Sequence, residues 1–356
     1  MDQASEVFLF DYLNNNAPVG YETAGQKLWL GYLSPYIDDQ LTDTYGTAVG
    51  IINPQASYKV VIEAHADEIS WYVNYITKEG YIHVIRNGGS DYEIAPSMRA
   101  RVHVGGKTIP AVFGWPAIHV RDKKKRIKPE IETIVLDCGC NSDKEVAALG
   151  IHVGCVVTFD EELITLNQRY LVGRALDNRI GGFMIAEVAK RLHGRKAKLP
   201  FSLYIVNAVQ EEVGLKGASM IAHRLKPDLA IITDVTHDTQ SPNYSKIKVG
   251  DIACGKGPVL THAPAVQNNV LRMLIEVAQQ NKIAFQRQAC SRHTGTDTDA
   301  FAYSSTGIAA ALISLPLKYM HTTVEMVHKQ DIEQVVELFY QFLVQLDPKH
   351  NFSYFK

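Results

Sequence analysis

The stretch LYIVNAVQEE (residues 203–212) decides the fold, because a continuous apolar run ends there in two adjacent carboxylates. Such apolar runs are typical of strands buried on both faces of a sheet. Three other runs lead to a histidine or an aspartate: VVIEAH (60–65), LAIITD (229–234) and AAALISLPLKYMH (309–321). In an open α/β sheet, ligands bind in the crevice outside the carboxyl ends of the strands. The sequence therefore predicts one convergent site at that edge.

The candidate site residues are imidazoles and carboxylates from five separate segments: His65, Asp177, Glu211, Glu212, Asp234 and His321. Asp177 lies in GRALDNRIGG (173–182), where a turn leads into a predicted helix. Imidazole and carboxylate without thiolate suit zinc or cobalt, and manganese is also possible. We therefore predict a site for divalent metal ions.

Helical and strand patterns alternate along most of the chain. Helices are predicted over residues 178–194, 268–281 and 331–346, between the apolar runs. The segments 41–52 and 58–65 are interpreted as strands. The alternation predicts an α/β fold with a mixed, mostly parallel sheet flanked by helices.

The middle of the chain differs from both flanks, because its apolar runs are short, alternating and bounded by glycine. RVHV-GG-KTIPAVFG (101–114) has the two-residue Gly-Gly link of a tight hairpin. We expect a discontinuous domain over residues 1–67 and 167–356 that holds the predicted metal site. Residues 68–166 are expected to form an inserted, β-barrel-like assembly domain.

Composition excludes several classes of function. The 356 residues carry a net charge of −2, which gives no general attraction to nucleic acid or to an anionic membrane. The basic run RDKKKRIK (121–128) lacks interleaved aromatic residues and is interpreted as a solvated loop. No apolar run reaches the roughly 20 residues of a membrane helix. Five cysteines without a CxxC pair indicate free thiols, which predicts a cytoplasmic protein.

Each motif also has a simpler structural interpretation when it is taken alone. Asp177 could cap a helix, Asp234 could be a turn residue, and His321 could be a buried histidine.

Two motifs point to chemistry more directly. In AHADE (64–68), Asp67 would face His65 and accept a hydrogen bond from the second N–H of its imidazole. Glu211 and Glu212 would face opposite ways in an extended strand. One glutamate could then bind metal while the other accepts a proton from water.

Taken together, the motifs resemble the M42 family of co-catalytic metalloaminopeptidases, also called tetrahedral, deblocking or glutamyl aminopeptidases. The resemblance covers nearly the whole chain. It depends on AHADE, GRALDNRIGG, QEEVGLKGA, the aspartate of IITDV, GTDTDAFAY and SLPLKYMHTTVE, which occur in the expected order. One departure is TGTDTDA (294–300), where many members have a shorter GGTDA. The sequence leaves open whether Asp297 or Asp299 lines the substrate pocket.

The resemblance implies a role for each candidate. Asp177 would bridge two divalent ions. One ion would be completed by His65 and Asp234, the other by Glu212 and His321. Glu211 would be the general base, and Asp67 would support His65.

The predicted function is a dinuclear metal-dependent aminopeptidase that removes N-terminal residues from short peptides with a free N-terminus. The nucleophile would be a hydroxide that bridges the metals. The alternatives are a metal-dependent deacylase or carboxypeptidase on the same fold, and a non-catalytic assembly subunit. The family resemblance also implies a homo-oligomer, a dodecamer of tetrahedral shape. Substrate preference stays open, because Arg174, Lys216, Arg292 and Lys318 all lie near motifs and none can be assigned.

Overall fold

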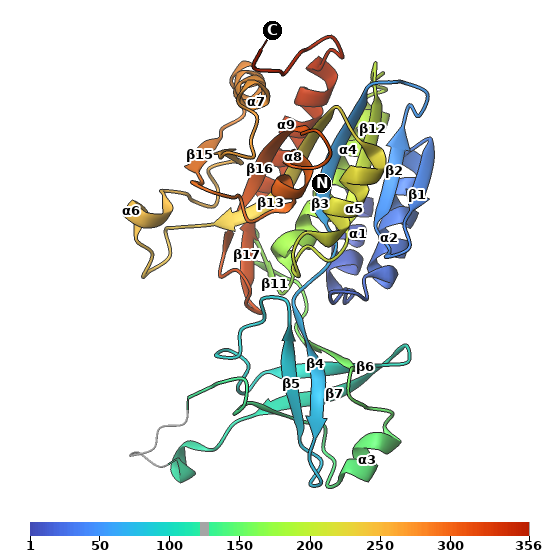
Figure 1. Ribbon diagram of the computed structural model, residues 1–356. Helices are drawn as coiled ribbons and strands as arrows, with labels where there is room; N and C mark the ends of the chain where they lie inside the picture. Colours follow the sequence, from blue (N-terminus) through green and yellow to red (C-terminus); the bar gives the residue numbers. More distant parts are fainter. Residues whose placement is uncertain (122–127, 356) are drawn as a thin grey trace.

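The computed structural model describes residues 1–121 and 128–355 and shows a helix-covered sheet joined to a small barrel (Figure 1). Within these residues the sheet has 11 strands. Its centre is parallel, in the order β12 (Ser202–Ala208), β3 (Lys59–His65), β13 (Leu229–His237) and β16 (Ala309–Lys318). All seven residues of β12 are buried, which explains its continuous apolar sequence.

Antiparallel strands extend both edges of this parallel centre. On one side β12 pairs with β2 (Ala48–Ile52), which pairs with β1 (Asp39–Thr42). On the other side β16 is followed by β17 (Glu325–His328), β11 (Tyr170–Gly173) and β10 (Ile164–Leu166). A further strand, β14 (Val259–His262), pairs with β16 and with β15 (Gln286–Ala289).

Helices cover both faces of the sheet. One face is covered by α4 (Leu176–Gly194), which packs against β3, α1 (Gln3–Asn14), α2 (Thr23–Leu33) and α9 (Lys329–Gln345). The other face carries α5 (Lys216–Leu225) and α8 (Asp297–Ala302). α7 (Asn268–Gln280) packs against α9 and β14, and α6 (Lys246–Val249) projects from the sheet region (Figure 1). The predicted mixed α/β fold flanked by helices is confirmed.

A closed six-stranded barrel follows β3 in the chain and precedes β10. Its strands, in barrel order, are β4 (Ser70–Ile76), β5 (Ile82–Asn87), β8 (Val135–Asp137), β7 (Lys107–Gly114), β6 (Arg99–Val104) and β9 (Val156–Phe159). The predicted Gly-Gly hairpin joins β6 to β7, where Val104 pairs with Lys107. A separate apolar core that includes Trp71 and Phe113 fills the barrel. One short helix, α3 (Asp143–Ala148), precedes β9. The predicted inserted β-rich domain is confirmed.

The strand predicted over residues 41–52 needs correction. Residues 41–52 do not form a single strand. The side chain of Asp43 accepts hydrogen bonds from the backbone N–H groups of Tyr45, Gly46 and Thr47, and these bonds stabilise a turn between β1 and β2. Most of the basic run 121–128 lies outside the described residues. In the part of the chain that the structure describes, no helix combines the length and apolar character needed to cross a membrane.

Candidate metal centre

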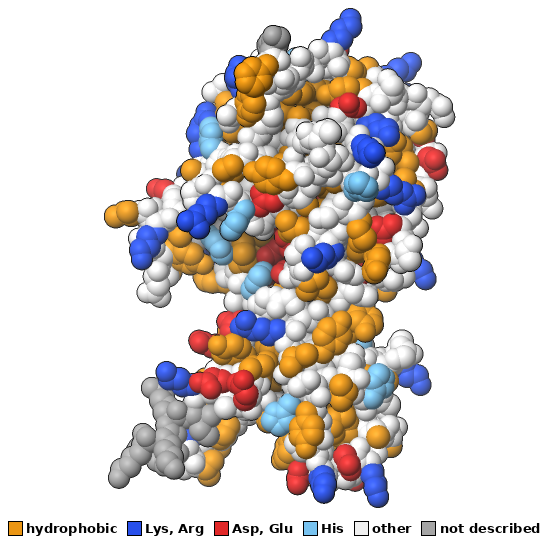
Figure 2. All heavy atoms as spheres, in the orientation of Figure 1, with side chains coloured by type: hydrophobic (Ala, Val, Ile, Leu, Met, Phe, Trp, Pro, Cys, Tyr) orange, Lys and Arg blue, Asp and Glu red, His pale blue; other side chains and the backbone are white. Residues whose placement is uncertain are grey.

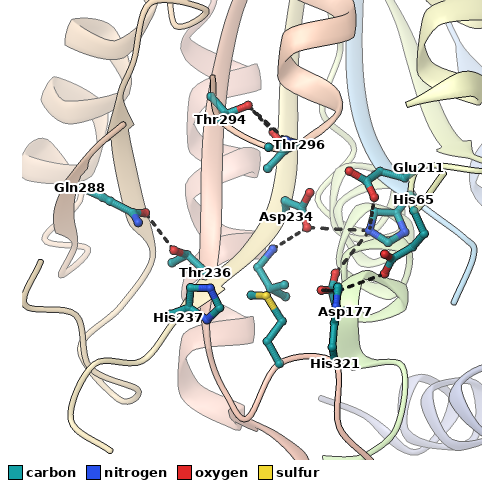
Figure 3. A pocket seen from close by; sticks show the side chains of 14 residues that line it. His65, Asp177, Glu211, Asp234, Thr236, His237, Gln288, Thr294, Thr296 and His321 are labelled. Carbon is teal, nitrogen blue, oxygen red and sulfur yellow. Dashed lines mark hydrogen bonds and ion pairs between the residues drawn. The ribbon is translucent and has the colours of Figure 1, made fainter. Parts of the chain in front are cut away.

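One cavity of about 280 Å³ gathers the candidate residues at the carboxyl edge of the central strands (Figure 3). All six predicted positions line it: His65, Asp177, Glu211, Glu212, Asp234 and His321. They come from β3, β13, the start of α4, and the segments that follow β12 and β16. Side chains up to 256 residues apart in sequence therefore meet at one point, from His65 to His321.

The central strands place two of these residues differently. His65 is the last residue of β3, as predicted. Asp234 is not at a strand end, because β13 continues to His237. The pairing of β13 with β3 nevertheless stops at Ile232 and Glu63. Asp234 therefore lies just past the point where the two strands separate, which gives its carboxylate room to face His65.

Glu211 and Glu212 lie three and four residues beyond the end of β12, where the chain turns, so the predicted strand alternation does not apply to them. The preceding residue, Gln210, has a φ of 58°, which turns the chain sharply. The two carboxylates still point to different histidines. An oxygen of Glu211 lies 3.9 Å from His65 Nε2, and an oxygen of Glu212 lies 3.5 Å from His321 Nε2.

Asp177 is the central residue of the cluster. Its Oδ1 lies 3.4 Å from His65 Nε2, and its Oδ2 lies 3.2 Å from His321 Nε2. The backbone at Asp177 and Asn178 is not helical, so the regular part of α4 begins after them, and among the described residues no backbone N–H of the helix donates a hydrogen bond to the Asp177 carboxylate. A carboxylate whose two oxygens face different imidazoles has the geometry of a bridge between two ions.

The spacing of the donor atoms fits cations. Three groups of donors could each hold one ion: His65 with Glu211 and Glu212, His65 with Asp177 and Asp234, and Asp177 with Glu212 and His321. The last two groups share Asp177. Two ligand atoms that each lie about 2.0–2.1 Å from a tetrahedral ion are about 3.4 Å apart. The observed donor separations of 3.2 to 4.0 Å match this geometry better than they match direct hydrogen bonds.

Asp67 is completely buried and braces one side of the cluster. Its two oxygens accept hydrogen bonds from the backbone N–H groups of Glu211 and Glu212, at 3.0 and 3.1 Å. One of these oxygens also lies 3.5 Å from His65 Nδ1. Asp67 therefore orients an imidazole and the turn that carries both glutamates.

Glu325 braces the other side, and the sequence interpretation missed its role. Its two oxygens accept hydrogen bonds from the backbone N–H groups of Asp177 and His321, at 2.9 and 2.7 Å. The side chain is 2% exposed. The sequence signal that could have identified Glu325 is its position four residues after His321, in HTTVE. Glu325 is the first residue of β17, and the pairing of this strand was not predicted.

A second feature that the sequence did not reveal is the Gly88–Gly89 pair, which follows strand β5 of the barrel. A Cβ atom at Gly89 would lie 2.7 Å from the ring of His321, which is too close for any side chain. A Cβ at Gly88 would approach Glu212 to 3.3 Å. The barrel thus contacts two of the candidate ligands through glycine.

Protonation of the cluster is governed by burial and by crowding of like charges. Burial, together with the charge of Asp234, raises the pKa of Glu211 to about 10 against the opposing effect of His65. Burial alone would lower the pKa of His321, but Asp177 and Glu212 raise it to about 11. Without cations the cluster therefore holds protons. Cations that bind there would displace these protons, which is typical of a metal centre.

The chain matches the M42 glutamyl aminopeptidase family over residues 46–338. It belongs to this family. The chain is 30% identical to a lysyl aminopeptidase from Pyrococcus furiosus over 332 residues, which cover 92% of this chain and 94% of the relative. The protein is therefore an aminopeptidase, a hydrolase that acts on peptide bonds. Membership of this metallopeptidase family also implies divalent cations, and the donor set of the cavity fits them.

Solved structures agree with this assignment. An aminopeptidase from the archaeon Desulfurococcus kamchatkensis superposes with a TM-score of 0.89 at 29% identity, covering 98% of this chain and 96% of that one. The TET1 peptidase of Pyrococcus horikoshii, which assembles into a tetrahedron or a large octahedral shell, superposes with a TM-score of 0.83 at 26% identity. That alignment covers 96% of this chain and all of the other.

Proposed function

We propose that this M42 aminopeptidase uses two divalent cations to remove N-terminal residues from short peptides with a free N-terminus. Asp177 would bridge the ions, with His65 and Asp234 on one and Glu212 and His321 on the other. The observation that carries this proposal is that the two oxygens of Asp177 face different histidines, at 3.4 and 3.2 Å. Zinc or cobalt suits these ligands best, and manganese is compatible with them.

The charges of the donor set support a pair of ions. Three ligand carboxylates contribute a formal charge of −3 against about +4 from two divalent cations. The small remaining positive charge favours a negatively charged nucleophile and a developing oxyanion. When bound, such cations lower the pKa of a water molecule and polarise a carbonyl group.

The residues of this chain would handle the protons. Glu211 would accept a proton from the attacking water and pass it to the leaving amine. Asp67 would keep Glu211 in place through the backbone of the turn, and Glu325 would hold Asp177 and His321. His237, which lines the same cavity, is a candidate donor to the oxyanion.

The decisive test compares free and blocked N-termini. Full-length protein loaded with zinc or cobalt should release amino acids from peptides with a free amine and leave the N-acetylated forms intact. Cleavage restricted to acylated substrates would instead support the deacylase alternative. Elemental analysis should find two cations per chain.

We also propose that the chain forms a closed homo-oligomer with the barrel as its assembly domain. The similarity to the TET1 peptidase supports this proposal. A dodecamer of the 39.6 kDa chain would have a mass of about 475 kDa. Light scattering should give that mass, and a monomeric mass would contradict the proposal. A cytoplasmic location stays a prediction from the cysteine content.

A further inference from the structure

The cavity has two walls of different chemistry. One wall is the cluster of imidazoles and carboxylates. The other is formed by β13, β15 and the segment before α8, and its polar members are Thr236, His237, Gln288, Thr294 and Thr296. Figure 3 shows Thr236 and Gln288 on the side of Asp234 that faces away from His65.

We propose that this second wall receives the side chain of the N-terminal residue and selects an uncharged one. The inference rests on the proposed function, which places the scissile carbonyl at the cluster. The side chain of the first residue must then occupy the space that remains in the cavity. The expected substrates have small or medium neutral residues, such as Ala, Ser, Thr, Gln or Leu, at the N-terminus.

Among the described residues, the second wall offers no permanent cation that could recognise an acidic side chain, because none of the residues that line the cavity is a lysine or an arginine. The imidazole of His237 also lies on this wall, and burial lowers its pKa, which favours the uncharged form. Arg174 is 7% exposed and forms a buried ion pair with Glu68. Lys216 and Arg292 are exposed and lie outside the cavity lining, and so does Lys318 at the end of β16.

The part of this wall that the structure describes also contains no free carboxylate for a basic side chain. Asp299 accepts hydrogen bonds from the backbone N–H groups of Thr294 and Gly295, at 2.9 and 3.2 Å, and so closes the turn before α8. Asp297 is 1% exposed and turns toward the buried Glu63 on β3. The two aspartates that the sequence left open therefore shape the loop and the interior, and neither lines the cavity.

Neutral polar groups on the wall are already arranged. The Thr236 hydroxyl donates to the side-chain oxygen of Gln288 at 2.9 Å, which leaves the Gln288 amide –NH₂ as a donor. The hydroxyls of Thr294 and Thr296 lie 2.9 Å apart and contact each other. A hydroxyl, amide or short aliphatic side chain can fit here without an unpaired charge. A charged side chain would lose its hydration without gaining a counter-charge.

The matched family is described as glutamyl and one relative as a lysyl aminopeptidase, so a charge preference is the natural rival. The test measures kcat/KM of the zinc-loaded or cobalt-loaded full chain on aminoacyl-coumarin substrates with N-terminal Ala, Ser, Gln, Leu, Glu, Asp, Lys and Arg. The best neutral substrate should exceed every charged one by tenfold or more. A charged substrate within tenfold of the best neutral one would overturn the inference.

Two variants examine the wall directly. Gln288→Arg should raise the ratio of Glu to Gln hydrolysis by at least tenfold, and Gln288→Glu should do the same for the ratio of Lys to Gln. Gln280→Arg, on the exposed end of α7, is the matched control and should leave both ratios unchanged. Unchanged ratios in both Gln288 variants would place the side-chain pocket elsewhere and contradict the inference.

A binding measurement separates this inference from the proposed function. In a metal-loaded Glu211→Gln variant, calorimetry would compare Kd for the dipeptides Gln-Ala, Glu-Ala and Lys-Ala. Tighter binding of Gln-Ala, by tenfold or more, supports the neutral pocket whatever the wild-type protein hydrolyses. Equal or tighter binding of a charged dipeptide contradicts it. Failure of the wild-type protein to cleave any free-amine peptide would contradict the proposed function instead.

Discussion

The sheet edge and the barrel contribute unequally to the cavity, although they lie side by side in the chain. The sheet, its helices and their connecting turns hold every candidate ligand, the proposed base and both carboxylate braces. Gly88 and Gly89, which follow β5 of the barrel, lie so close to Glu212 and His321 that an added Cβ atom would approach these candidate ligands to 3.3 and 2.7 Å. Figure 2 shows the two bodies joined through a narrower region. The candidate ligands thus come from the strand ends and turns of the sheet, which leaves the inserted barrel available for the proposed role in assembly.

The largest expected effect on turnover comes from the proposed base. Glu211→Gln should lower kcat by about 10²–10⁴-fold, because a positioned general base contributes about that much. The fold and the content of bound cations should stay unchanged, as measured by circular dichroism and elemental analysis. Glu130→Gln, an exposed site in the barrel, is the control. Wild-type turnover in Glu211→Gln would remove this residue from the role.

The second carboxylate brace should matter nearly as much as a ligand. Glu325→Gln should reduce cation affinity or kcat by about 10–100-fold, because partners that orient metal ligands typically contribute that amount. Cation affinity would be measured by competition with a chelator, and turnover with a neutral aminoacyl substrate. Glu276→Gln on the exposed face of α7 should have neither effect. If Glu325→Gln behaved like this control, the brace would be structural only.

The glycine contact tests whether the barrel influences the site. Gly89→Ala places a methyl group where His321 now lies, and it should lower kcat/KM by about tenfold through displacement of that imidazole. Gly114→Ala, also in the barrel, is the matched control, because its added Cβ would have only an ordinary contact at 3.9 Å. Equal activity of the two variants would show that the barrel and the cluster are independent.

The barrel core should affect stability and assembly more than chemistry. Trp71 is 1% exposed and its ring packs near those of Phe113 and Phe159. Trp71→Ala should destabilise the barrel by about 3–5 kcal/mol. The oligomeric mass should fall, while kcat/KM on a short substrate changes less than about twofold. A loss of turnover beyond tenfold with the assembly intact would contradict the division of roles.

The smallest expected effect is a shift of stability with pH in cation-free protein. Burial raises the pKa of Glu63, beneath the cluster, to about 8. Between its ordinary value near 4.5 and about 8, the folded chain keeps a proton that the unfolded chain loses, so stability falls as pH rises. Tm of chelated protein should therefore decrease from pH 6 to 8.5, and less steeply in Glu63→Gln. A rising Tm over that range would contradict this assignment.

Much of the site could be predicted because several of its residues belong to short, recognisable sequence patterns. An apolar run followed by histidine or acid marks a buried strand and its end, so His65 and the turn after β12 were accessible from sequence. The position of Asp234 within β13 was not, because it depends on where β3 stops pairing. Glu325 and Gly89 were missed for a similar reason. Their contacts depend on how β17 and the barrel return to the cluster, which no short pattern encodes.

The bridge at Asp177 is the central claim, and anomalous diffraction tests it most directly. Crystals of the zinc-loaded or cobalt-loaded protein would be measured at the absorption edge of the metal. The account predicts two peaks, about 3.5–4 Å apart, on either side of the Asp177 carboxylate. A single peak, or peaks bound away from Asp177, would contradict it.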